Sequence, residues 1–271
     1  MIPVRDDQPR FITPYVTYFL IALNLVIFLL ESALTPESFK TLLFEFGMIP
    51  AHITVYLSGA GPLGLVAVLL PAFTSMFLHG SWMHVIGNMW FLWIFGDNIE
   101  DYLGHFKYLF FYLASGLGAA FAQVILNPHS RVPTVGASGA IAGVLGAYFL
   151  LYPKARVLIW FPIFFFFYLP AWVTLGYWFA MQFISGAATS ASAYSDTRGG
   201  VAFWAHVGGF VAGILLIKIL PNVWIILLTT HEIPEVHRLL REVGIHAVVP
   251  KSKAATHLIA QADALFTRSA A

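Results

Sequence analysis

The sequence predicts an all-α membrane protein with six transmembrane helices and a long first loop. The first observation is that 59% of its 271 residues are hydrophobic and only 10% are charged, whereas a soluble domain averages about 25% charged residues. The second is that apolar segments of about 17 residues or more, or close to that length, recur along the chain. The third is that lysine and arginine gather on alternate loops, as they do in proteins that cross a membrane several times.

Each predicted span is a run of apolar residues bounded by polar or turn-forming residues. The fourth is rich in Gly and Ala and, at about 1.5 Å per residue, reaches only about 26 Å, so it is expected to start below the membrane surface. A shorter run at 61–73 contains Gly and Pro and fits an interfacial or re-entrant part of the first loop. The six spans are predicted at 15–30, 82–95, 108–126, 136–152, 157–184 and 201–220.

The positive charges predict the orientation. With both termini cytoplasmic, only Lys40, Arg131 and Arg198 of the 14 basic residues lie outside. We therefore expect a multi-pass protein of the cell (plasma) membrane, whose site opens toward the outer face. Its parts would be a cytoplasmic N-terminus (1–12), a six-helix membrane domain (13–229) and a cytoplasmic tail (230–271) with a solvated helix.

Composition also excludes several classes of function. There are no cysteines, so disulfides, thiol catalysis and cysteine-ligated metals are excluded. The net charge of +1 and the lack of a dense basic run argue against nucleic-acid binding. No metalloprotease motif of the form H-E-x-x-H occurs. We expect neither a metal nor another cofactor, and the sequence does not indicate an oligomeric state.

Polar side chains inside the spans are the candidate functional residues, because they are costly in lipid. His84 and Asn88 lie one helical turn apart near the outer end of the second span. Ser138 lies in the first turn of the fourth span, and His206 lies near the outer end of the sixth. These four side chains are therefore predicted to meet at one depth in the membrane.

Glycines indicate which helices can approach closely. Gly139 and Gly143 share one face of the fourth span, with Gly136 at its start. Gly209 and Gly213 share a face of the sixth span with His206. Faces of small residues let membrane helices pack backbone to backbone, which would bring Ser138 within hydrogen-bond reach of His206.

A serine hydroxyl is a weak nucleophile that needs a neighbouring base, and a neutral imidazole is the usual one. No acidic residue occurs between Asp101 and Asp196, so a Ser-His-Asp triad is not expected. The residues instead permit a Ser138–His206 dyad. His84, Asn88 and the Ser138 amide could then donate to a developing oxyanion.

Three short strings together resemble the rhomboid intramembrane serine proteases: HGSWMHVIGN at 79–88, GASG at 136–139 and AHVGGF at 205–210. The resemblance runs from about Phe73 to Gly213 in the family's order, and it implies a rhomboid-like bundle of six helices. It further implies that Ser138 is the nucleophile, His206 the general base and acid, and transmembrane proteins in the lipid bilayer the substrates.

Two positions depart from the family's pattern. The family's Trp-Arg pair in the first loop is replaced by Leu70-Pro71, and the tyrosine that stacks on the histidine in some members is replaced by Ala142. The resemblance therefore leaves open how His206 is held.

Two other functions are compatible with the same residues. One is a non-catalytic rhomboid-like protein that binds membrane proteins without cutting them. The other is a transporter in which His84, Asn88 and His206 form a polar pathway, although the inner halves of the spans are almost wholly apolar apart from Gln123 and Gln182.

Overall fold

The computed structural model describes residues 2–62, 64–161, 165–191, 201–220, 226–229 and 247–250. The chain divides into two units, Met1–Leu220 and Pro221–Ala271. In the second unit, β4 (Ile226–Thr229) pairs in parallel with β5 (Ala247–Pro250). The helix predicted from charges between residues 232 and 242 lies outside the described residues. The first unit contains all the candidate site residues.

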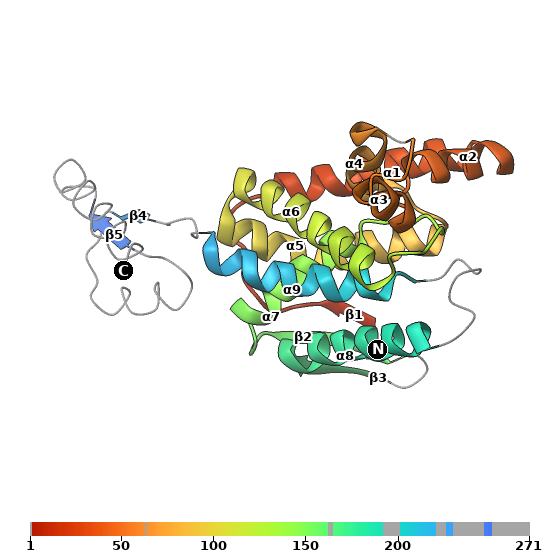
Figure 1. The fold of residues 1–271 in the computed structure, drawn as a ribbon. Helices are drawn as coiled ribbons and strands as arrows, with labels where there is room; N and C mark the ends of the chain where they lie inside the picture. The colour runs from red at the N-terminus through yellow and green to blue at the C-terminus, as the bar shows by residue number, and fades with distance from the viewer. Residues whose placement is uncertain are drawn as a thin grey trace. The chain divides into compact units, whose positions relative to one another are not determined.

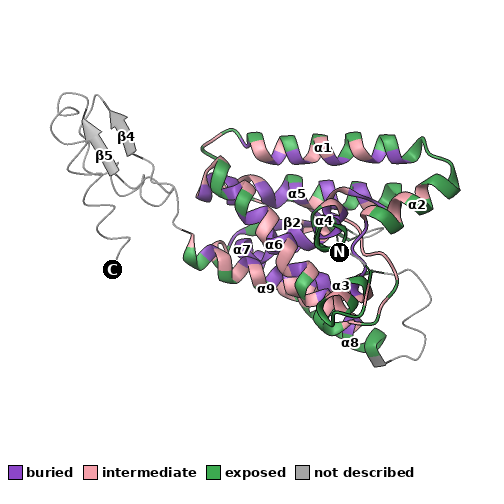
Figure 2. Ribbon diagram, turned by 45° about the horizontal axis from the view of Figure 1, so that its top comes forward, coloured by how far each residue is buried: buried purple, intermediate pink, exposed green. Residues whose placement is uncertain are grey.

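The first unit is mostly helical, and helices are confirmed at five of the six predicted spans. Short segments fill the long first loop: α2 (Pro36–Phe46), α3 (Pro50–Leu57), α4 (Leu65–Thr74) and a 3₁₀ helix at Ser75–Phe77. In Figures 1 and 2, α1 lies along one edge of the bundle and α8 along the opposite edge. The long helices are α1 (Tyr15–Ser32), α5 (Trp82–Leu103), α6 (His105–Leu126), α7 (Ser138–Leu151), α8 (Ala171–Ala191) and α9 (Phe203–Ile219).

Helix α7 is the enclosed element of the bundle. Every residue from 139 to 148 is buried, and the helix packs against α5, α6 and α9. By contrast, many residues on the outer faces of α1 and α8 are exposed (Figure 2). The 14 residues of α7 reach about 21 Å at about 1.5 Å each, which is shorter than a hydrocarbon core of about 30 Å. The start of α7 can therefore lie below the membrane surface.

By length and composition, two of the described helices, α1 and α6, can each cross a membrane unaided. The count rises to three if the segment from Leu65 to Phe77 forms one broken span with α5, from which it is bent by 77°. Most of the stretch predicted to be interfacial or re-entrant, 61–73, thus lies in α4. Helices α7 and α9 are apolar but shorter, and the predicted count of six spans is not established by this criterion.

The prediction of one helix over 157–184 is wrong, although the unit as a whole is mostly helical, as predicted. The segment begins with β2 (Arg156–Phe161) and β3 (Phe165–Pro170), and only then enters α8. These strands pair antiparallel, and β1 (Ile2–Arg5) pairs antiparallel with the other edge of β2. Aromatic and β-branched residues favour strands, and Pro162 and Pro170 cannot donate the backbone hydrogen bonds of a helix interior. The length of the apolar segment alone did not reveal that two strands precede the helix.

A buried carboxyl group at the end of α5 anchors the start of α1. Glu100 is fully buried, and it accepts hydrogen bonds from the amides of Val16 (2.9 Å) and Thr17 (2.7 Å) and from the Thr17 hydroxyl (2.7 Å). His105 Nδ1 lies 2.6 Å from the same carboxyl group. The first amides of a helix have no partner within the helix, so Glu100 caps α1 from the neighbouring helix.

Replacing Glu100 with alanine is therefore expected to lower the free energy of unfolding by about 1–3 kcal/mol, because buried donors lose their acceptor. The measurement is chemical unfolding in detergent micelles. Glu37→Ala is the matched control, since Glu37 is exposed on α2 and surface changes are usually within about 0.5 kcal/mol. Equal effects of the two substitutions would contradict this role of Glu100.

Candidate active site

The structure joins Ser138 and His206 by a hydrogen bond. Ser138 is the first residue of α7, and His206 lies in the first turn of α9. The Ser138 Oγ and the His206 Nε2 are 2.7 Å apart. His206 is only 9% exposed. The N-cap of α7 is Ala137, which makes no side-chain cap, and the Ser138 hydroxyl bonds to the histidine of α9.

Glycines bring these two helices together. A Cβ at Gly209 would overlap the carbonyl oxygen of Gly139, and one at Gly213 would overlap that of Gly143. On α7, a Cβ at Gly139 would come within 2.6 Å of Ala119 on α6. The glycines of α9 thus meet the backbone of α7, and Gly139 also allows α6 to approach.

Gly136 differs from the other predicted packing glycines because it lies before α7 rather than within it. It precedes α7, has a φ of +123°, and donates its amide to the carbonyl of Ser75 at 2.8 Å. A Cβ here would lie 2.6 Å from His84 Nε2. A side chain is therefore excluded both by backbone conformation and by the histidine ring that lies against this residue.

His84 and Asn88 on α5 both face the segment that leads into Ser138. A Cβ at Gly136 would also lie 3.6 Å from the Asn88 amide nitrogen. That nitrogen also donates to His79 Nε2 at 3.0 Å. An amide NH₂ group carries two hydrogens, so this bond leaves the second hydrogen for another acceptor. The two side chains predicted as oxyanion donors are thus gathered beside the start of α7.

Three residues of this region were not recognised from the sequence. His79 is fully buried, holds the Asn88 amide, and has its ring centroid 5.1 Å from that of His84. Gln182 Oε1 is 2.7 Å from His206 Nδ1. The Trp178 ring lies 5.8 Å from that of His206, with 34° between their planes. The spacing of Trp178 and Gln182 indicates from the sequence that they share one face of a helix, but not that this face meets His206.

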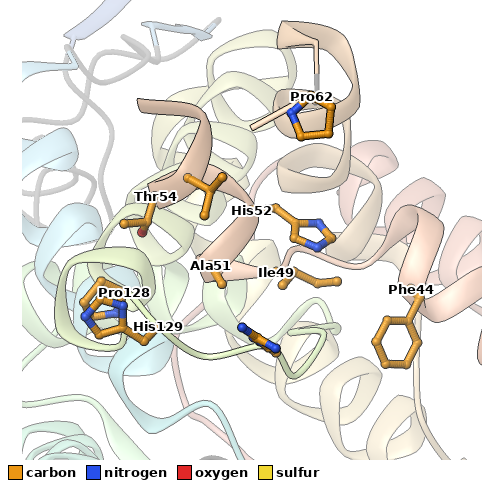
Figure 3. A pocket seen from close by; sticks show the side chains of 10 residues that line it. Phe44, Ile49, Ala51, His52, Thr54, Pro62, Pro128 and His129 are labelled. Carbon is orange, nitrogen blue, oxygen red and sulfur yellow. The ribbon is translucent and has the colours of Figure 1, made fainter. Parts of the chain in front are cut away.

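A hollow of about 550 Å³ lies away from these residues, between α3 and the loop that follows α6 (Figure 3). His52 from α3 and Pro128 and His129 from the loop contribute to its wall. Its lining contains neither the serine–histidine pair nor the two candidate oxyanion side chains.

The fold and the site define a helical membrane protein in which a serine and a histidine meet at the ends of two closely packed helices. Residues 67–223 match the family model described as the Rhomboid domain. The match covers more than half of the chain, and the chain belongs to the rhomboid family.

Curated proteins of the same family are similar to part of the chain. Rhomboid protein 1, mitochondrial, of Saccharomyces cerevisiae is 31% identical over 146 residues, 52% of this chain and 39% of that protein. Presenilin-associated rhomboid-like protein, mitochondrial, of Homo sapiens is 31% identical over 153 residues, 53% of this chain and 36% of that protein. Rhomboid-like protein 11, chloroplastic, of Arabidopsis thaliana is 39% identical over 71 residues, 26% of this chain and 25% of that protein. The chain thus spans about two fifths or less of the length of these relatives.

These relatives overturn the predicted location. They are named as mitochondrial and chloroplastic proteins, which contradicts the expectation of a plasma-membrane protein. The physical reason is that loop charges orient a chain across a membrane but carry no information about which membrane it enters.

Proposed function

We propose that this chain is an intramembrane serine protease that hydrolyses peptide bonds in or near the transmembrane segments of other proteins. The observation that carries the proposal is the 2.7 Å hydrogen bond between Ser138 Oγ and His206 Nε2. Membership of the rhomboid family supports the same type of fold. A nucleophile in hydrogen-bond contact with a base is the arrangement that covalent catalysis requires.

In the proposed reaction, Ser138 Oγ attacks the carbonyl carbon of the scissile bond while its proton passes to His206 Nε2. The resulting oxyanion accepts hydrogen bonds from the Ser138 amide, from Asn88 and from His84. Collapse of this intermediate breaks the C–N bond, and His206 returns the proton to the leaving amine. Water then attacks the acyl-enzyme, with His206 again as base, and releases Ser138.

The surroundings of the pair fit chemistry inside a membrane. Six long helices, α1 and α5 to α9, would form the bundle, with transmembrane proteins as substrates and the lipid bilayer as solvent. The names of the relatives favour an organellar membrane.

The start of α7 also favours the proposed chemistry. The first amides of α7 add the positive end of a helix dipole, which favours an oxyanion at this place. Since the dyad and these donors suffice, the proposal includes no metal or cofactor.

The test is cleavage of a single-span reporter protein by the purified chain in liposomes, with the products identified by mass spectrometry. Wild type should cut one peptide bond in or beside the reporter's transmembrane segment, and Ser138→Ala should not. Ser115→Ala is the matched control, because Ser115 is a buried serine of α6 whose hydroxyl has no partner among the described residues. Cleavage that survives Ser138→Ala would refute the proposal, and a wild type that binds the reporter without cutting it would indicate a non-catalytic binder.

Replacing Asn88 with alanine is expected to lower kcat by about 10- to 1000-fold, because one oxyanion donor is lost. KM should change little, since the donor acts mainly in the transition state. The substitution also leaves His79 without its partner, so melting temperature is measured alongside the kinetics to separate a folding defect. An unchanged kcat in a folded variant would exclude Asn88 from the oxyanion site.

A further inference from the structure

His206 makes a second hydrogen bond, on the side of the ring away from the serine. Its Nδ1 lies 2.7 Å from Oε1 of Gln182 on α8. A side-chain amide oxygen can only accept, so Nδ1 carries the hydrogen. In a neutral imidazole the other nitrogen then has the free lone pair, and that nitrogen is Nε2, which faces Ser138. Gln182 therefore selects the tautomer in which His206 can act as a base toward Ser138.

A second contact from the same helix restrains the ring. Trp178 lies one turn before Gln182, and its ring is 5.8 Å from the imidazole with 34° between the planes. The amide thus holds the edge of the imidazole while the indole packs near its face. Two contacts from α8 restrict rotation of a side chain that belongs to α9.

The surroundings explain why an amide, rather than a carboxylate, contacts Nδ1 of His206. No carboxylate exists between residues 101 and 196 of the sequence to occupy this place, and an ionised carboxylate buried in an apolar site is costly. An amide oxygen orients the imidazole without that cost. It cannot provide the full negative charge with which the aspartate of a triad stabilises an imidazolium.

We propose that Gln182 is a positioning residue, whose amide oxygen fixes the tautomer and orientation of His206. The inference rests on the proposed protease function for its kinetic consequence, but the hydrogen bond itself can be tested without any activity. It also gives α8 a defined part in a site otherwise built from α5, α7 and α9.

The kinetic test compares Gln182→Leu with Gln182→Glu on the liposome reporter. Leucine cannot accept the Nδ1 hydrogen, so kcat should fall about 10- to 100-fold with KM unchanged, as part of the general-base contribution is lost. Glutamate can accept it and should restore kcat to within about tenfold of wild type. Met181→Leu is the control, because Met181 is the exposed neighbour on the same helix and this swap conserves volume.

The second test is ¹⁵N NMR of the His206 ring in Ser138→Ala protein, which needs no turnover. With Gln182 present, the spectrum should show one neutral tautomer with the hydrogen on Nδ1. Adding Gln182→Leu should give a mixture of the two tautomers or the opposite one. This comparison depends only on the hydrogen bond and therefore reports on Gln182 even if the chain cuts no substrate.

The two tests separate the inference from the function on which it rests. One outcome is that cleavage requires Ser138, while Gln182→Leu changes neither kcat nor the tautomer. That outcome would overturn the role of Gln182 and leave the protease function intact. A second outcome is that Gln182→Leu changes the tautomer of His206 while the wild type never cuts the reporter. That outcome would support the positioning contact and refute the protease. Loss of kcat with a change of tautomer, and recovery with glutamate, is the predicted result.

Discussion

Ser138→Ala and His206→Ala are each expected to lower kcat by the same large factor, on the order of 10⁴ or more, and the double variant by no more than either one alone. The reason is the shared proton. Without the imidazole the hydroxyl stays protonated and unreactive, and without the hydroxyl the imidazole has nothing to activate. Residues that act as one unit in this way show strongly non-additive effects.

The measurement is single-turnover cleavage of the liposome reporter, with melting temperature recorded for every variant. Ser115→Ala again provides the baseline for loss of an intramembrane hydroxyl. Multiplicative losses in the double variant would show that the two residues act independently. That outcome would contradict a dyad even if both single variants were inactive.

Adding a single methyl group at Gly209 or Gly213 is expected to cost about 100-fold or more in kcat and to destabilise the fold. Each new Cβ would overlap a carbonyl oxygen of α7, so α9 would have to move outward. His206 sits on the same face of α9, one turn before Gly209, and would move with it. A misplacement of about 1 Å in a catalytic group can cost on the order of 10²-fold in rate, and overpacking typically costs about 1–3 kcal/mol.

The control is Gly87→Ala on α5, where a Cβ would meet nothing within 4 Å. Alanine is favoured over glycine inside a helix by up to about 1 kcal/mol, so this variant should be as stable as wild type or more so. Unfolding in detergent and reporter cleavage are measured for all three proteins. Full activity of Gly209→Ala would show that the close approach of α7 and α9 is not needed to hold the pair.

The sequence predicted the helices that carry the serine–histidine pair because their signals are local. Ser138 and His206 stand out as polar groups in apolar runs, and glycine spacing identifies the faces on which α7 and α9 can meet. The strand pair at Arg156–Phe161 and Phe165–Pro170 was missed because an apolar segment of that length fits a spanning helix equally well. Its prolines and aromatic residues were the available signal for strands.

The partner of His206 was missed for a different reason. Gln182 appeared in the sequence as an isolated polar residue of an apolar segment, and helical periodicity does not say which face of α8 turns toward α9. That rotation is set by packing between helices, such as the contact of Trp178 and Phe179 with Phe210. The hydrogen bond to Nδ1 could therefore be found only once the helices were placed.

The most direct test of the central claim is covalent labelling of the serine. A fluorophosphonate forms a bond between phosphorus and an activated serine oxygen and releases fluoride, and peptide mapping by mass spectrometry locates the modified residue. The account predicts modification of Ser138 in the wild type, with Ser115 unmodified, and loss of the modification in His206→Ala. An unmodified Ser138 in protein that still cleaves the reporter, or equal labelling without His206, would contradict it.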